Sequence, residues 1–144
     1  MRLALDTNVW LDWLVFDDPA IIPLKSANSD RLVRIAVNAG CLEELGRVLA
    51  YPDFELNAHT RDALISQVRN CTCLPETRLR AKLPRCTDPD DQKFLELARD
   101  ARVEWLLTRD KALLALTGKR NNGTAFKIGT PEQWAVAFES IKPR

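Results

Sequence analysis

The sequence predicts an α/β fold, a three-layer α/β/α arrangement around a mainly parallel sheet of five strands. Short apolar segments rich in β-branched residues alternate along the chain with longer segments whose apolar residues recur at helical spacing. This alternation favours parallel strands joined by right-handed crossovers, which place helices on both faces of the sheet. No repeat, low-complexity tract or linker divides the chain, so we expect a single domain over residues 1–144.

The expected elements follow one another in a regular order. The strands are expected at residues 2–6, 31–37, 71–74, 103–108 and 124–128. The helices are expected at residues 9–14, 17–27, 39–51, 60–70, 88–101, 109–119 and 131–141. The first of these strands, "RLALD", is a short apolar run and is expected to be buried.

Several helix starts carry capping residues. Asp18 precedes Pro19, and Asn38 precedes an apolar stripe that ends before a proline. Asp88 is a third candidate cap, followed by Pro89 and by acids through the first turn. The last helix opens with Thr-x-x-Gln from Thr130, a capping-box pattern. These signals fix the starts of four helices.

Composition excludes several classes of protein. The hydrophobic share is 46% and the charged share 28%, as in an ordinary soluble domain. No run approaches the roughly 18 apolar residues of a membrane span. The acid at position 6 comes too early for a signal peptide, so we expect a cytoplasmic location. One histidine, His59, and four cysteines without Cys-x-x-Cys spacing argue against a structural zinc site; the cysteines are Cys41, Cys71, Cys73 and Cys86.

Acidic residues follow the predicted strands. Asp6 ends the first strand, Asp110 follows the fourth by two residues, and Asp91 lies in the first turn of the helix before that strand. Glu44 lies at the margin of a buried helical stripe, whereas Glu43 points to solvent. Because ligands bind beyond the carboxyl ends of parallel strands, the four acids Asp6, Glu44, Asp91 and Asp110 are expected to converge there.

Each acid also has a purely structural interpretation. Asp6 and Asp110 can cap helices, Glu44 can be a surface acid, and Asp91 can serve a helix dipole as well as Asp90 can. A fold that collects four carboxylates nevertheless needs a cation, since two carboxylates ~4 Å apart repel by roughly 4 kcal/mol at an effective dielectric of 20. Oxygen ligands favour Mg²⁺ or Mn²⁺ and suit phosphoryl chemistry.

Four blocks, in this order and at these separations, carry a specific resemblance: "LDTNV", "LEELGRVLAYPDF", "DPDDQKFLELA" and "EWLLTRDKALL". The chain resembles the PIN-domain nucleases over nearly its whole length. It is most similar to the bacterial subgroup regarded as toxins of toxin–antitoxin pairs. The resemblance implies the sheet order 3-2-1-4-5 and Mg²⁺- or Mn²⁺-dependent endoribonuclease activity, in which metal-activated water cleaves RNA phosphodiester bonds. It also implies an RNA substrate, an antitoxin protein as partner and often a dimer.

The resemblance assigns roles to individual residues. The catalytic and metal-binding acids would be Asp6, Glu44, Asp91 and Asp110. The supporting polar shell that orients these acids would be Thr7, Asn8 and Thr108. Three positions depart from the family pattern, because Asn38 replaces a commoner Ser or Thr, Trp10 is bulky and Arg109 replaces a frequent Gly.

Basic residues are unevenly distributed. Residues 1–60 carry a net charge of −4 and residues 61–144 a net charge of +5, which suits a polyanionic partner. The candidate RNA-binding residues are Arg78, Arg80, Lys82 and Arg85 of "ETRLRAKLPR", with Arg109. A solvated connecting segment explains the basic stretch equally well. Among the tryptophans, Trp10 is the candidate wall of a substrate groove, whereas Trp105 and Trp134 are expected in the core.

Two other functions compete with the nuclease. A haloacid-dehalogenase-type phosphatase also starts with an aspartate after its first strand, but its mechanism needs Asp-x-Asp, and Asn8 stands at the second position. The other alternative is a catalytically inactive module that binds RNA or a protein. The presence of all four acids argues against it.

Overall fold

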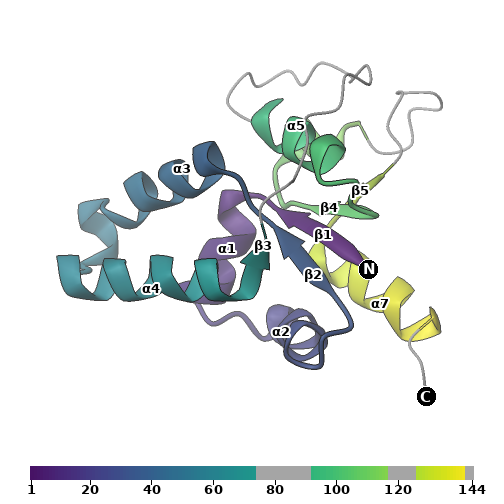
Figure 1. Ribbon diagram of the computed structural model, residues 1–144, viewed down its shortest axis with the longest axis horizontal. Helices are drawn as coiled ribbons and strands as arrows, with labels where there is room; N and C mark the ends of the chain where they lie inside the picture. The colour runs from purple at the N-terminus through teal and green to yellow at the C-terminus, as the bar shows by residue number, and fades with distance from the viewer. Residues whose placement is uncertain (74–91, 117–125, 142–144) are drawn as a thin grey trace.

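A parallel β-sheet forms the centre of the computed structural model, which describes residues 1–73, 92–116 and 126–141 (Figure 1). Each strand pairs in parallel with its neighbours, in the order β3-β2-β1-β4-β5. The strands are β1 (Arg2–Leu5), β2 (Arg34–Ala36), β3 (Thr72–Cys73), β4 (Trp105–Leu107) and β5 (Lys127–Gly129). The prediction of an α/β fold with a mainly parallel sheet is confirmed.

Helices connect and follow the strands. The α-helices are α1 (Thr7–Leu14), α2 (Ile22–Ser29), α3 (Ala39–Leu49), α4 (Ala58–Cys71), α5 (Gln92–Asp100), α6 (Lys111–Leu114) and α7 (Pro131–Ile141). Two 3-10 turns complete the described elements, η1 (Pro19–Ile21) and η2 (Pro52–Phe54). None of the helices in the described ranges combines the length and the apolar character that crossing a membrane requires.

Alternate side chains of the central strand enter two different hydrophobic clusters. Leu3 and Leu5 pack in one cluster with residues of α1, α2 and α7, including Trp134. Ala4 packs in the other cluster with residues of α5 and α6, including Leu113. Because successive side chains of a strand point to opposite faces, the two clusters lie on the two faces of the sheet. Helices therefore cover both faces, and the carboxyl edge of the strands stays between them.

The predicted caps that fall on described residues are present, with one difference. Asn38 accepts a hydrogen bond from the Cys41 backbone N–H at 2.8 Å and starts α3. Asp18 caps the 3-10 turn η1 rather than an α-helix. The reason is Pro23, which is tolerated only in the first turn of an α-helix, so α2 begins separately at Ile22. Asp88 lies outside the described residues.

The C-terminal elements are partly shorter than predicted. The capping box of α7 is formed, since the Thr130 hydroxyl accepts from the Gln133 N–H at 3.1 Å and the Gln133 side chain accepts from the Thr130 N–H at 2.9 Å. The helix expected over residues 109–119 is only one turn, Lys111–Leu114, in the described part of the chain. Trp134 is fully buried and Trp105 packs against the same cluster, as predicted.

Candidate active site

Asp6 is held at the carboxyl edge of the central strand. Its backbone N–H donates to the Leu107 carbonyl at 3.0 Å, which ties the end of β1 to β4. One carboxylate oxygen accepts from the Val9 N–H at 2.9 Å, so Asp6 is also the N-cap of α1. Only 3% of the residue is exposed. The apolar run before Asp6 and the helix after it thus place a buried carboxylate where the sheet ends.

Thr108 links Asp6 to Asp110. The buried Thr108 hydroxyl donates to the second carboxylate oxygen of Asp6 and accepts from the backbone N–H of Asp110 at 2.9 Å. The Asp110 side chain accepts from the N–H groups of Ala112 at 2.8 Å and Leu113 at 3.3 Å, which starts α6. The structural interpretation of both aspartates as caps therefore holds. A carboxylate has about four acceptor positions, so capping leaves others free.

Burial raises the pKa of Asp6 from 3.8 to about 6. The hydrogen bonds from Thr108 and Val9 act in the opposite direction, and the negative charge of Asp110 raises the pKa further. The charge of Asp6 is thus unfavourable in its site, although the site holds it with two donors. A nearby cation would remove this penalty.

Glu44 projects from α3 toward the same place. One oxygen accepts from the Thr7 hydroxyl at 2.5 Å, and the other lies 2.6 Å from the ammonium of Lys93 on α5. Its neighbour Glu43 points away and pairs with Arg47 at 3.0 Å, with 73% of its side chain exposed. Helical spacing separates the two glutamates in the way the sequence predicted.

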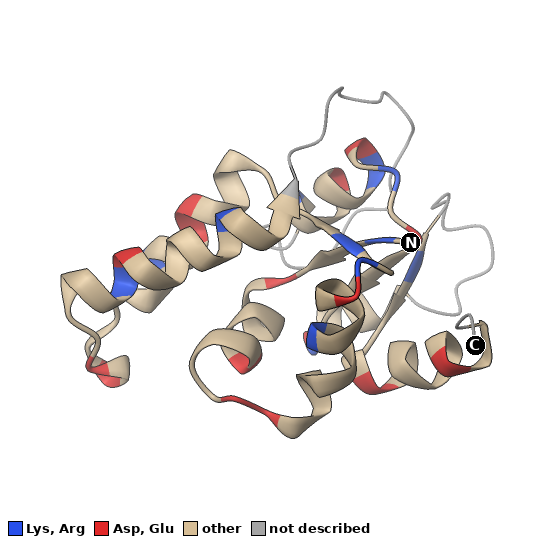
Figure 2. Cartoon of the chain, turned by 60° about the horizontal axis from the view of Figure 1, so that its bottom comes forward, with Lys and Arg blue, Asp and Glu red and all other residues tan. Residues whose placement is uncertain are grey.

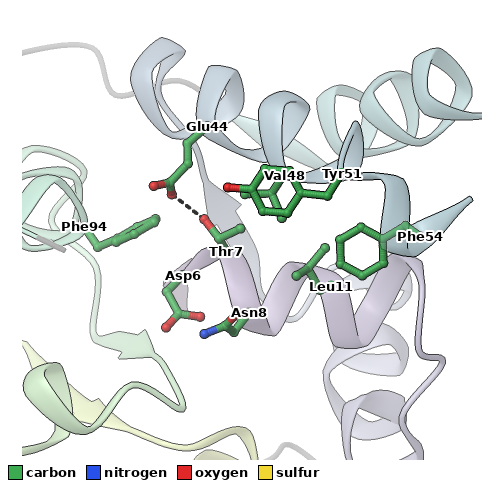
Figure 3. Close-up of a pocket in the computed structure, with 9 residues that line it drawn as sticks. All are labelled: Asp6, Thr7, Asn8, Leu11, Glu44, Val48, Tyr51, Phe54 and Phe94. Carbon is green, nitrogen blue, oxygen red and sulfur yellow. Dashed lines mark hydrogen bonds between the residues drawn. The ribbon is translucent and has the colours of Figure 1, made fainter. Parts of the chain in front are cut away.

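Asp6 and Glu44 line one cavity of about 370 Å³ (Figure 3). Thr7 lies between them, and Asn8 is exposed in the first turn of α1 beside Asp6. The remaining lining residues are apolar or aromatic, namely Leu11, Val48, Tyr51, Phe54 and Phe94. The cavity therefore joins a group of acids to a hydrophobic wall.

The donor chemistry of this site fits a hard divalent cation. Asp6 and Glu44 line the same cavity, the charge of Asp110 raises the pKa of Asp6, and the burial of Asp6 disfavours an uncompensated charge there. Within the described ranges, however, no three His, Cys, Asp or Glu side chains are grouped closely enough to hold a metal ion. The fourth expected acid, Asp91, lies outside those ranges, as do Arg78, Arg80, Lys82 and Arg85.

Arg109 is engaged by acids of the chain itself. Its guanidinium pairs with Asp12 at 2.7 Å, with Asp18 at 3.7 Å and, through two hydrogen bonds, with Glu132. These contacts raise the pKa of Arg109, the hydrogen bond to Glu132 being the largest cause. Arg109 thus connects the loop after β4 to α1, η1 and α7. Its proposed contact with RNA stays a prediction.

Trp10 does not line the cavity, so the prediction that it forms a groove wall is wrong. It is 3% exposed and packs 5.3 Å from Trp13 between ring centroids, in the core against the sheet. The aromatic residues at the cavity, Tyr51, Phe54 and Phe94, were missed, as was the Lys93 contact. The sequence could have indicated Tyr51, because it follows the end of the helix that carries Glu44.

Basic residues begin three of the strands, and acids follow the opposite ends of two. Arg2, Arg34 and Lys127 are exposed first residues of β1, β2 and β5, whereas acids follow the opposite ends of β1 and β4. Figure 2 shows the basic residues of the strands near the amino end of the chain. The cavity therefore opens at the edge of the sheet opposite to these basic side chains.

Comparison with known proteins gives one result. The PIN domain matches residues 2–112, a region that includes all four predicted acids. No curated protein and no solved structure matches the chain. The match covers well over half of the sequence and is consistent with the α/β fold and its parallel sheet. The chain belongs to the PIN domain family.

Proposed function

We propose that this protein is a divalent-metal-dependent endoribonuclease that hydrolyses RNA phosphodiester bonds. PIN domains are generally nucleases. The observation that supports the proposal most directly is the buried carboxylate of Asp6, which shares a cavity with Glu44 and is affected by the charge of Asp110. Such a set of oxygen donors suits a cation that in turn binds a phosphate.

The proposed ligands of Mg²⁺ or Mn²⁺ are Asp6, Glu44, Asp91 and Asp110. A bound cation would lower the pKa of a water and stabilise the leaving oxygen of the phosphodiester. Thr108 would fix the orientation of Asp6, and Thr7 that of Glu44, through the hydrogen bonds described above. Asn8, exposed at the mouth of the same cavity, would contact the substrate or a water beside it.

A cleavage assay on a broad RNA panel tests the proposal. We expect cleavage with Mg²⁺ or Mn²⁺, none with Ca²⁺ alone and none in excess EDTA. The chain offers a matched pair of variants on one helix. Glu44→Gln should abolish cleavage, whereas Glu43→Gln should retain it, because Glu43 faces solvent. Cleavage that continues in EDTA would contradict the metal dependence.

The basic segment Arg78, Arg80, Lys82 and Arg85 is proposed to contact the RNA backbone, together with Arg109. Each phosphate contact to a single strand contributes about 0.7 to the salt slope of binding. Replacing the four segment residues together should therefore lower this slope measurably. An unchanged slope would identify an ordinary solvated segment.

We also propose a biological role and an oligomeric state. We infer a toxin of a toxin–antitoxin pair that acts as a homodimer. A neighbouring reading frame that encodes a small protein with a DNA-binding start and a disordered tail would support the toxin role. Light scattering of the purified protein tests the dimer.

An inactive RNA- or protein-binding module is the second candidate. The ion pair between Lys93 and Glu44 favours it, because the ammonium engages one of the expected metal ligands. RNA binding without cleavage under any divalent cation would select this alternative.

A further inference from the structure

The cavity at the carboxylates extends into a hydrophobic compartment. Asp6, Thr7 and Glu44 line one part of it, and Leu11, Val48, Tyr51 and Phe54 line the other (Figure 3). Leu11 is 5% exposed and belongs to the core, and Val48 is half-buried against the same cluster. The apolar part therefore has a floor that the fold supports and an opening that it shares with the acids.

Tyr51 is the most exposed aromatic side chain of this compartment. Its backbone N–H donates to the Val48 carbonyl at 3.0 Å as α3 ends, and Pro52 immediately starts η2. The main chain thus fixes the position of Tyr51, yet the residue remains 55% exposed. In Figure 3 its ring lies between the Thr7–Glu44 pair and the Leu11–Phe54 pair. An aromatic ring held in this way offers apolar surface without a large cost in ordering.

Phe54 extends the aromatic surface and is itself supported. Its ring centroid lies 5.9 Å from that of Phe16, with the two planes tilted by 59°. This separation is within the range of favourable aromatic pairs. Phe16 follows α1 and Phe54 closes η2, so the pair joins two elements that frame the cavity. The wall is therefore built from separate segments rather than from one loose loop.

The occupant must satisfy both parts of the cavity at once. The acids require a cation or a group bound through one, and the aromatic part requires a flat apolar group a short distance away. A nucleotide has both, a phosphate and a base. We propose that Tyr51 and Phe54 form a stacking subsite for one base of single-stranded RNA, next to the phosphate at Asp6 and Glu44. The inference rests on the proposed function and specifies how its substrate is held.

Base stacking on an aromatic ring is largely independent of sequence and favours unpaired nucleotides, because every base has a π-face and paired bases are already stacked. The subsite therefore accounts for recognition of single-stranded RNA without hydrogen bonds to particular base edges. It also places the stacking residues directly after α3, the helix that carries Glu44, because Tyr51 precedes η2 and Phe54 ends it.

Binding of a short fluorescent single-stranded RNA, measured by anisotropy in Ca²⁺, tests the subsite. Tyr51→Ala should weaken binding by about 5- to 150-fold, the range for one stacked base. Tyr51→Phe keeps the ring and should bind like the wild type. Ile22→Ala is the matched control, since Ile22 is 60% exposed and lies on α2 away from the cavity. Thermal melts of all variants check that the fold is retained.

Combining the Tyr51 variant with a modified RNA shows whether Tyr51 contacts a base. An RNA with one abasic position at the stacked nucleotide should lose affinity for the wild type to a similar extent. The same RNA should show almost no further loss with Tyr51→Ala, because the stacking partner is already absent. Equal losses for both proteins, or a loss that Ile22→Ala or Tyr51→Phe shares, would overturn the stacking subsite.

The remaining outcomes separate this inference from the nuclease. Wild-type protein that cleaves RNA, with Tyr51→Ala binding unchanged, overturns the subsite and leaves the proposed function intact. Wild-type protein that neither binds nor cleaves any RNA overturns both. If Tyr51→Ala leaves RNA binding unchanged and instead releases a copurifying protein, the wall is a protein-docking surface, and the subsite is again overturned.

Discussion

The ammonium of Lys93 lies 2.6 Å from one carboxylate oxygen of Glu44, while the Thr7 hydroxyl lies 2.5 Å from the other. Both Lys93 and Glu44 are partly buried, with side chains 29% and 20% exposed. The protein thus supplies its own cation to an acid that is expected to bind metal. Metal binding would have to displace the ammonium or share the carboxylate with it.

Lys93→Met should change metal-free stability and the response to metal in opposite directions. The variant keeps the apolar stem but removes the charge, so the free energy of unfolding in EDTA should fall by about 1 kcal/mol. The rise in melting temperature on adding Mg²⁺ should become larger, because no ammonium competes for Glu44. Thermal melts with and without Mg²⁺ measure both effects.

Lys25→Met is the control for Lys93→Met. Lys25 pairs with Asp17 at 3.1 Å, and its side chain is 32% exposed, close to the value for Lys93. Its replacement should leave the Mg²⁺ response unchanged. A smaller Mg²⁺ response in Lys93→Met would show that Lys93 helps to organise the metal site instead of competing with the metal.

The parts of this site that were predictable depend on local sequence. Asp6 stands at the end of an apolar run, and Glu44 at the margin of a helical stripe, so strand and helix periodicity locate both. The Lys93–Glu44 pair joins positions 49 residues apart and depends on how α5 packs beside α3. Periodicity carries no information on such packing. The parallel sheet was predictable for the same local reason as Asp6, because strand and helix segments alternate.

Trp10 shows where local reasoning failed. Four residues of α1 are buried, Val9, Trp10, Leu11 and Trp13, so the helix is covered on more than one side. The prediction for Trp10 rested on its place in the chain, close to Asp6 and Asn8. The side chains of α1 are buried on several sides because residues of the sheet, α3 and α7 pack in the same cluster. This packing depends on the tertiary arrangement and not on the local sequence.

Asp6 should make the metal-free protein less stable as the pH rises. In the unfolded chain Asp6 titrates near 3.8, and in the folded protein its pKa is about 6 because of burial. Between these values the folded state binds more protons, so stability from this group is fully present below about pH 4 and is lost by about pH 6. The penalty above that range should be about 3 kcal/mol.

Urea unfolding in EDTA at several pH values isolates this contribution. Asp6→Asn can still cap α1 and should be more stable than the wild type above about pH 6, with the difference shrinking toward about pH 4. Asp62→Asn, an exposed acid on α4, should follow the wild type at every pH. A difference that grows toward low pH would mean that the Asp6 carboxylate is stabilised in the fold.

Arg109→Met should destabilise the protein by about 2 kcal/mol, because hydrogen bonds to charged groups are lost and three carboxylates remain near one another. Arg109→Lys should recover only part of this loss, since an ammonium cannot bind Glu132 through two parallel hydrogen bonds. Arg47→Met, which removes an exposed pair with Glu43, should cost less than about 0.5 kcal/mol.

The same Arg109 variants test the predicted RNA contact. If Arg109 acts only inside the fold, RNA affinity measured well below the melting temperature should be unchanged in Arg109→Met. A lower salt slope of binding in this variant would show that its guanidinium also contacts phosphate.

Thr108→Val should abolish cleavage and lower stability together. Thr108 is fully buried, and its hydroxyl both donates to Asp6 and accepts from the Asp110 N–H. Valine has nearly the same shape but leaves these two polar groups without their partner, which should cost about 1–3 kcal/mol. Thr108→Ser restores the hydroxyl and should recover most of the activity, although it loses a buried methyl group.

Thr72→Val separates the two effects of Thr108→Val. The Thr72 hydroxyl donates to the Val68 carbonyl at 2.7 Å, at the end of α4. Thr72 begins the edge strand β3, which β2 and β1 separate from β4. Its loss should lower the free energy of unfolding but leave the cleavage rate of the folded protein unchanged. Chemical unfolding gives the stability of each variant, and cleavage rates at a temperature where all are folded give the activity. If Thr108→Val retains wild-type cleavage, then the orientation of Asp6 does not depend on this hydroxyl, and Thr108 only holds the fold together.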